Sequence, residues 1–133
     1  MPDFTHVNWL GVVLAAVLSM VLGYVYYLPQ VGGKRWEAAS GHTLPKPNTM
    51  IYIALVVTSL IMAYVLALLV GGSGLLSGGV RGILIWLGFV ATVSAGAVVF
   101  EGRNWAYWFV INAYWLITLL AMGALLGTLP ATM

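Results

Sequence analysis

Residues 80–126 read VRGILIWLGFVATVSAGAVVF, then EGRN, then WAYWFVINAYWLITLLAMGALL. Each of the two apolar stretches has about 20 residues, the length that an α-helix needs to cross a hydrocarbon core about 30 Å thick. Both are continuously apolar, whereas strands of a membrane barrel alternate in pieces of about ten residues. The four-residue link is so short that the two helices must be antiparallel neighbours.

Two more stretches of this kind precede the pair. We place the four spans at Val7–Leu28, Met50–Val70, Val80–Phe100 and Trp105–Leu126. The sequence therefore predicts an all-α, polytopic membrane protein, with four transmembrane helices in an antiparallel bundle that forms a single domain over residues 1–133.

The composition supports this prediction. The chain is 62% hydrophobic and 6% charged, whereas about a quarter of the residues in a soluble domain are charged. Contact with lipid must replace the missing charge. The chain has no cysteine, which excludes disulfides, thiolate metal sites and cysteine nucleophiles. Its net charge of +2 is too small to suggest a nucleic-acid partner.

Proline and glycine mark the breaks between spans. Pro29 ends the first helix near Leu28, and the second begins after Pro47. Between them, Lys34–Ser40 is suited to a short interfacial helix that Gly41 ends. We expect Gly71–Gly79 to be a flexible hairpin loop. The first span lacks the basic leader and cleavage site of a secretory signal, so we expect it to stay in the mature protein.

The basic residues predict the orientation. An even number of spans puts both termini and the 71–79 loop on one side, with Arg81 the basic residue there. The other basic residues belong to the opposite side: Lys34, Arg35, Lys46 and Arg103. Short loops rich in Lys and Arg stay cytoplasmic. We therefore expect both termini to lie outside the cytoplasm.

Aromatic residues mark both boundaries of the predicted bundle. Phe4, Trp9 and Trp86 are expected at the non-cytoplasmic boundary, and a larger group is expected at the cytoplasmic one: Tyr26, Tyr27, Trp36, Tyr52, Trp105, Tyr107 and Trp108. An interfacial belt explains such a pattern, and an aromatic pocket or partner-binding rim is the alternative.

Small residues spaced four apart predict how the helices pack, because helices in lipid associate by close approach. The first span carries Gly11, Ala15, Ser19 and Gly23, and the third carries Gly88, Thr92 and Gly96. These are the two better seams, so we expect the first and third spans to cross closely.

A few residues with polar groups form a candidate ligand-binding set: Glu101, Arg103, Asn112, Trp105 and Tyr64. Ionisable groups near the bilayer usually have partners. Glu101 could exchange a proton or bind a cation, and Arg103 could hold an anionic headgroup; a local salt bridge is the alternative. Asn112 lies deep in the fourth span, where its amide either bonds to a neighbouring helix or lines a cavity.

No set of residues for catalysis can be assembled. His6 and His42 are predicted on opposite sides of the membrane, so they cannot share a metal. There is no Ser/His/Asp set, phosphate loop or dinucleotide motif. We therefore expect no catalytic residues, metal or cofactor. A membrane enzyme acting on lipid would need a nucleophile or metal that this sequence does not offer.

The order of several short motifs resembles the bacterial membrane family known as domain of unknown function 1761. The residues that carry the resemblance are Asn8-Trp9; Gly23, Tyr27, Pro29, Gly33, Lys34 and Trp36; Met62-Ala63-Tyr64; Trp86-Leu87-Gly88-Phe89 with Ala91-Thr92; and Phe100-Glu101-Gly102-Arg103 followed by Ile111-Asn112-Ala113. The chain departs from the family at Tyr26, at Gly32 and at Trp115, where a histidine is common. The resemblance implies a small four-helix inner-membrane protein and brings no established activity.

Two functional hypotheses follow from these observations. The first is a non-catalytic module or accessory subunit that packs with itself, as a homo-oligomer, or with a larger membrane complex. The alternative is a protein that binds or transports a small molecule or lipid, using a site near Glu101, Arg103 and Asn112. Both place the protein in contact with the lipid bilayer.

Overall fold

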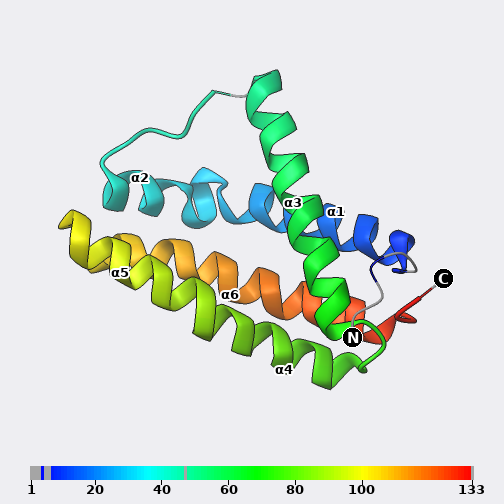
Figure 1. The fold of residues 1–133 in the computed structure, drawn as a ribbon. Helices are drawn as coiled ribbons and strands as arrows, with labels where there is room; N and C mark the ends of the chain where they lie inside the picture. Colours follow the sequence, from blue (N-terminus) through cyan, green and yellow to red (C-terminus); the bar gives the residue numbers. More distant parts are fainter. Residues whose placement is uncertain (1–3, 5–6, 47, 133) are drawn as a thin grey trace.

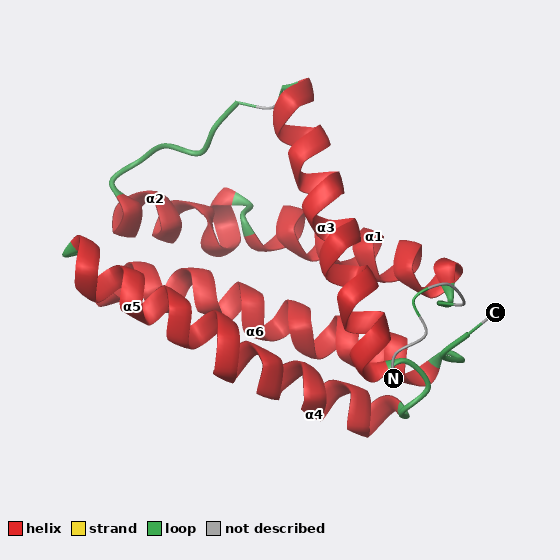
Figure 2. Cartoon of the chain, in the orientation of Figure 1, coloured by secondary structure: helices red, strands yellow, loops and turns green. Residues whose placement is uncertain are grey.

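The computed structural model describes residues 4, 7–46 and 48–132. This part of the chain consists of helices joined by loops, with no strand (Figure 2). The elements in chain order are α1 (Trp9–Tyr26), the π-helix η1 (Pro29–Gly33), α2 (Lys34–Ser40), α3 (Thr49–Val70), α4 (Leu75–Ile85), the π-helix η2 (Trp86–Ala91), α5 (Thr92–Glu101) and α6 (Trp105–Thr128). The predicted all-α class is confirmed.

Four of these helical segments are long and apolar enough to cross a membrane. They are α1, α3, the continuous helix α4–η2–α5 over Leu75–Glu101, and α6. We call Leu75–Glu101 the third span. The protein is therefore a multi-pass membrane protein, as the sequence predicts.

Asparagine begins three of the spans. The side chains of Asn8, Asn48 and Asn104 accept hydrogen bonds from the backbone N–H groups three residues further on, at 3.0, 3.0 and 2.8 Å. Each bond satisfies one of the donors that a helix N-terminus leaves without a partner. Two helices end at a glycine in the left-handed conformation, α2 at Gly41 and α5 at Gly102. Both of these helix ends belong to the side that we predict to be cytoplasmic. Gly102 and Asn104 together make the short reversal into α6.

The predicted 71–79 loop is longer than the real one. The turn uses Gly72 and Gly74, whose φ angles are 74° and 104°, and α4 already begins at Leu75. Glycine has a low helix propensity, which is why the sequence of this segment suggests a loop. Packing against α6 stabilises the helix over Gly78 and Gly79 all the same.

The arrangement in Figure 1 places α6 between α1 and the third span. The two ends of the described chain meet at one end of the molecule, where the Asn8 N–H donates to the Ala131 carbonyl at 3.2 Å and the Asn8 side chain donates to the Pro130 carbonyl at 2.9 Å. In this part of the chain α1 packs against α3 and α6, not closely against the third span. The expected close crossing of the first and third spans is therefore wrong, because α6 separates them.

The core lies where α1, α3 and α6 meet. Its members are buried apolar residues from these three helices, such as Val12, Ala15, Ala63, Val70 and Met122. The first ten residues of α3 contribute nothing to it, since nearly all of them are exposed. This half of α3 leans away from the other helices (Figure 1).

Candidate functional site

The closest helix contact joins α4 to α6 through facing glycines. A Cβ placed on Gly78 would overlap the Gly123 carbonyl, and one on Gly82 would overlap the Leu119 carbonyl. The fit is reciprocal, because a Cβ on Gly123 or Gly127 would overlap carbonyls of the α4 segment. Small residues let two backbones approach in this way inside a bilayer. Our sequence prediction missed Gly78 and Gly82, although the four-residue spacing from Gly74 was a usable signal.

The predicted small-residue seam of the first span also packs against α6. Gly11, Ala15 and Ser19 are buried, and a Cβ on Gly23 would lie 3.0 Å from the Tyr114 hydroxyl oxygen. That hydroxyl donates to the Ser19 carbonyl at 3.0 Å. These small residues therefore accommodate α6 and its tyrosine.

The predicted seam of the third span lies elsewhere. Gly88, Thr92 and Gly96 are exposed, and apart from the adjacent backbone of its own helix and its chain neighbours, nothing comes within 4 Å of a Cβ built on Gly88 or Gly96. The Thr92 hydroxyl donates to the Gly88 carbonyl of its own helix at 2.7 Å. We call Gly88, Thr92 and Gly96 the open seam.

Asn112 is the centre of a buried polar network. Its Nδ2 donates to the Ser94 hydroxyl at 2.9 Å and to the Trp108 carbonyl at 3.0 Å, while its Oδ1 accepts from the Trp86 indole at 3.0 Å. Both amide hydrogens are thus used. The network connects α6 to the first residue of the π-helix η2 and to α5, which follows it.

Side-chain donors form hydrogen bonds to backbone carbonyls of the π-helix η2. The Trp108 indole donates to the Ala91 carbonyl at 3.1 Å, and the Ser94 hydroxyl donates to the Val90 carbonyl at 2.6 Å. A π-helical turn disturbs the regular backbone ladder and is often found at functional positions. Here these donors compensate for that disturbance. Trp86 belongs to this central network, so its expected place at the non-cytoplasmic boundary is wrong.

Glu101 and Arg103 form an ion pair at the turn between α5 and α6. The Arg103 Nε lies 3.2 Å from the Glu101 Oε2, and the side chains are 35% and 54% exposed for Arg103 and Glu101. The guanidinium also lies 4.7 Å from the centre of the Tyr107 ring. Asn104 joins the turn to the end of α2, since its Nδ2 donates to the Ala39 carbonyl at 3.2 Å.

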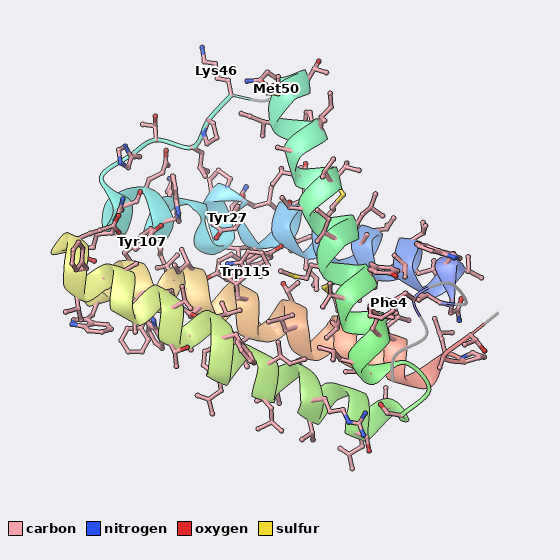
Figure 3. The ribbon with its side chains drawn as sticks, in the orientation of Figure 1. Phe4, Tyr27, Lys46, Met50, Tyr107 and Trp115 are labelled. Atoms are coloured by element: carbon pink, nitrogen blue, oxygen red, sulfur yellow. The ribbon has the colours of Figure 1, made fainter. Side chains whose placement is uncertain are left out.

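The remaining two predicted ligand-binding residues lie apart from each other, and Trp105 begins α6 directly after the turn. The Trp105 ring lies 6.1 Å from that of Trp108. Tyr64 stacks on Trp9 at 5.3 Å and its hydroxyl donates to the Phe4 carbonyl at 2.8 Å. In Figure 3, Phe4 and Tyr107 are labelled at opposite ends of the molecule. The five residues therefore occupy three separate places.

Two hollows lie among the spans. The larger, of about 330 Å³, separates α3 from the third span and α6. It is lined by Thr58, Ile61, Met62, Val65, Leu66, Leu69, Ile85, Val90 and Leu119. We call it the lateral groove. The smaller, of about 160 Å³, lies beside Tyr26 and Tyr114. Over the described ranges there is no cluster of three metal-ligating His, Cys, Asp or Glu residues.

Comparison with known proteins yields a family. A model described as "Protein of unknown function (DUF1761)" matches residues 10–127. No curated protein and no solved structure matches the chain.

Proposed function

The chain belongs to the DUF1761 family of proteins of unknown function, and we propose that it is a non-catalytic membrane module that packs against a second copy of itself through the open seam. The observation that carries this proposal is the exposure of Gly88, Thr92 and Gly96. The seams of α1 and α4 face α6, whereas this seam faces outward.

Exposed small residues on a membrane helix indicate a surface that another helix can approach closely. Lipid tails are as apolar as leucine, so helices in a bilayer gain little from hydrophobic burial and associate by close packing. A helix face that meets lipid alone has no need of small side chains. A face with Gly88, Thr92 and Gly96 in line permits a neighbouring backbone to approach closely.

The alternative function, a ligand site near Glu101, Arg103 and Asn112, has less support. The amide hydrogens of Asn112 are both donated within the protein. Glu101 and Arg103 bind each other on the surface, outside the two hollows. The arrangement favours a structural role for these residues.

We also propose a location and an orientation. Helix α2, which begins with Lys34 and Arg35, and the α5–α6 turn, which contains Arg103, lie at the end of the molecule away from Asn8 and the Pro130–Ala131 segment. Short basic loops remain in the cytoplasm, which supports an orientation with both termini outside. The family resemblance implies the bacterial inner membrane as the location.

Co-purification tests self-association. Two copies of the full chain, each with a different affinity tag, are expressed together, extracted in mild detergent and captured through one tag. We expect the second tag to be retained. A preparation containing one protomer per particle, with the second tag lost, would contradict the proposal; a different membrane protein in its place would redirect it to a larger complex.

A further inference from the structure

The lateral groove has almost no polar wall. Eight of its lining residues are apolar, and the ninth, Thr58, donates its hydroxyl to the Ala54 and Leu55 carbonyls of its own helix at 2.9 and 3.1 Å. All the lining residues belong to membrane-spanning helices. The molecules that reach such a groove are those of the bilayer.

Arg81 lies at one end of this groove. It precedes Ile85 by one helical turn, on the same face of α4. Its Nη1 donates to the Leu69 carbonyl at 3.1 Å, and both Leu69 and Ile85 line the groove. The groove thus has a positive charge at its end near the termini and an apolar wall beyond it.

The depth of Arg81 puts its guanidinium within reach of a lipid phosphate. The third span has 27 residues, which is about 40 Å of helix against a hydrocarbon core of about 30 Å. With the helix centred, about 5 Å extends beyond the core at each end. Arg81 lies about 9 Å from the start of the helix, or about 4 Å inside the core edge, and an arginine side chain extends far enough to reach the headgroups.

We propose that the lateral groove binds one acyl chain of a membrane phospholipid, in the leaflet on the side of the termini, with the lipid phosphate on Arg81. The guanidinium has five N–H donors and suits a phosphate in geometry as well as charge. The side chains that line the groove below it match a hydrocarbon chain.

The size of the groove favours a chain over a helix. One turn of α-helix with its side chains, about 10 Å across and 5.4 Å long, occupies roughly 420 Å³. The whole groove holds about 330 Å³. An acyl chain is much narrower than a helix with its side chains, so a segment of one fits this space, and the open seam, which lies outside the groove, is left for a protein partner.

Photo-crosslinking tests the position of the chain. The probe is a phosphatidylglycerol with a diazirine in its acyl chain, added to the full-length protein in vesicles. We expect labelling on peptides that contain Met62, Val65 or Ile85. Even labelling around all four helices would overturn the proposal.

Two matched substitutions test the groove itself. Val65 lines the groove and Val57 does not, and their side chains are 47% and 48% exposed. Val65→Phe should fill part of the groove and lower labelling at Met62 at least threefold, while Val57→Phe should leave it unchanged. Equal labelling in the two variants would overturn the proposal.

Arg81 is tested with a second probe, a diacylglycerol with the same diazirine chain but no phosphate. A basic residue near an anionic surface contributes about 1 kcal/mol, so Arg81→Gln should lower labelling by phosphatidylglycerol about fivefold. Labelling by diacylglycerol should not change, and Arg81→Lys should keep most of the phosphatidylglycerol signal. If Arg81→Gln lowers both probes equally, or neither, the phosphate contact is wrong.

Discussion

The third span carries two glycine seams of the same spacing, and they have opposite environments. Gly78 and Gly82 in α4 lie against the backbone of α6, whereas Gly88 and Gly96 border open space. Six residues, or about one and two-thirds turns, separate Gly82 from Gly88, and the π-helix η2 begins within this interval. The second seam therefore faces another direction. A small-residue repeat shows that a close approach is possible, and the fold decides whether the neighbour is internal or external.

The largest expected effect comes from filling the internal seam. In Gly78→Leu the new side chain meets the Gly123 carbonyl, a backbone atom that cannot move aside without shifting α6. Overpacking typically costs about 1–3 kcal/mol, and we expect this variant to reach about 3 kcal/mol because the added side chain meets backbone atoms. Denaturant unfolding in detergent micelles, followed by circular dichroism, measures the loss.

Gly88→Leu is the matched control for Gly78→Leu. Its added side chain enters open space, so the stability of the protomer should stay within about 0.5 kcal/mol. Equal destabilisation by the two variants would show that the two seams do not differ as described.

Removing Asn112 tests what holds the π-helix η2, which begins between the two seams. Asn112→Leu leaves the Trp86 indole without its acceptor and Ser94 without its donor. We expect the protomer to lose about 1.5 kcal/mol, near the upper end for polar contacts between membrane helices. The same unfolding assay measures this, with tryptophan fluorescence reporting on Trp86.

Thr92→Val provides the comparison for Asn112→Leu. The Thr92 hydroxyl donates to its own helix rather than across helices, so the protomer should keep its stability within about 0.5 kcal/mol. A loss as large as that of Asn112→Leu would argue against a central role for the Asn112 network.

Filling the open seam should act on association alone. Gly96→Leu is expected to raise the dissociation constant of the dimer about tenfold, or 1.4 kcal/mol, with no change in protomer unfolding. Energy transfer between two labelled copies in vesicles measures it. Ala54→Leu, which also enlarges an exposed position in a span, should leave energy transfer unchanged; an equal loss there would point to a nonspecific effect.

The smallest effect is expected at the turn beyond the open seam. Glu101→Gln removes a surface ion pair, and such pairs contribute about 0–1 kcal/mol. Unfolding should shift by no more than about 0.5 kcal/mol. A much larger shift would assign Glu101 more than a local role, and the double variant with Arg103→Gln would show whether the ion pair is the cause.

The four spans could be predicted from the sequence because length and hydropathy determine which helices can cross a bilayer. The short helix Lys34–Ser40 and the antiparallel third and fourth spans followed from proline, glycine and loop length. The start of α4 could not be predicted in the same way, because packing against α6 overrides the weak helix propensity of Gly78 and Gly79. The sequence also did not determine which helices pack against each other, since small residues fit any close neighbour.

The candidate residues show the same limit. Asn112 was identified from its depth, but its partners Trp86 and Ser94 depend on how α6 turns against the third span. Tyr64 and Glu101 were grouped by residue type, and the fold separates them by the length of the bundle. The lateral groove had no signal in the sequence, because it arises from the tilt of α3.

Single-cysteine scanning along Leu75–Glu101 tests the open seam most directly, since the chain has no cysteine of its own. Each variant is oxidised in native membranes, and the disulfide-linked dimer is quantified; such a bond requires Cα atoms within about 7 Å of each other. We predict maxima at Gly88, Thr92 and Gly96, with little dimer at exposed Leu76 or Leu84. A scan without dimer, or one whose maxima fall on Leu76 and Leu84, would contradict the account.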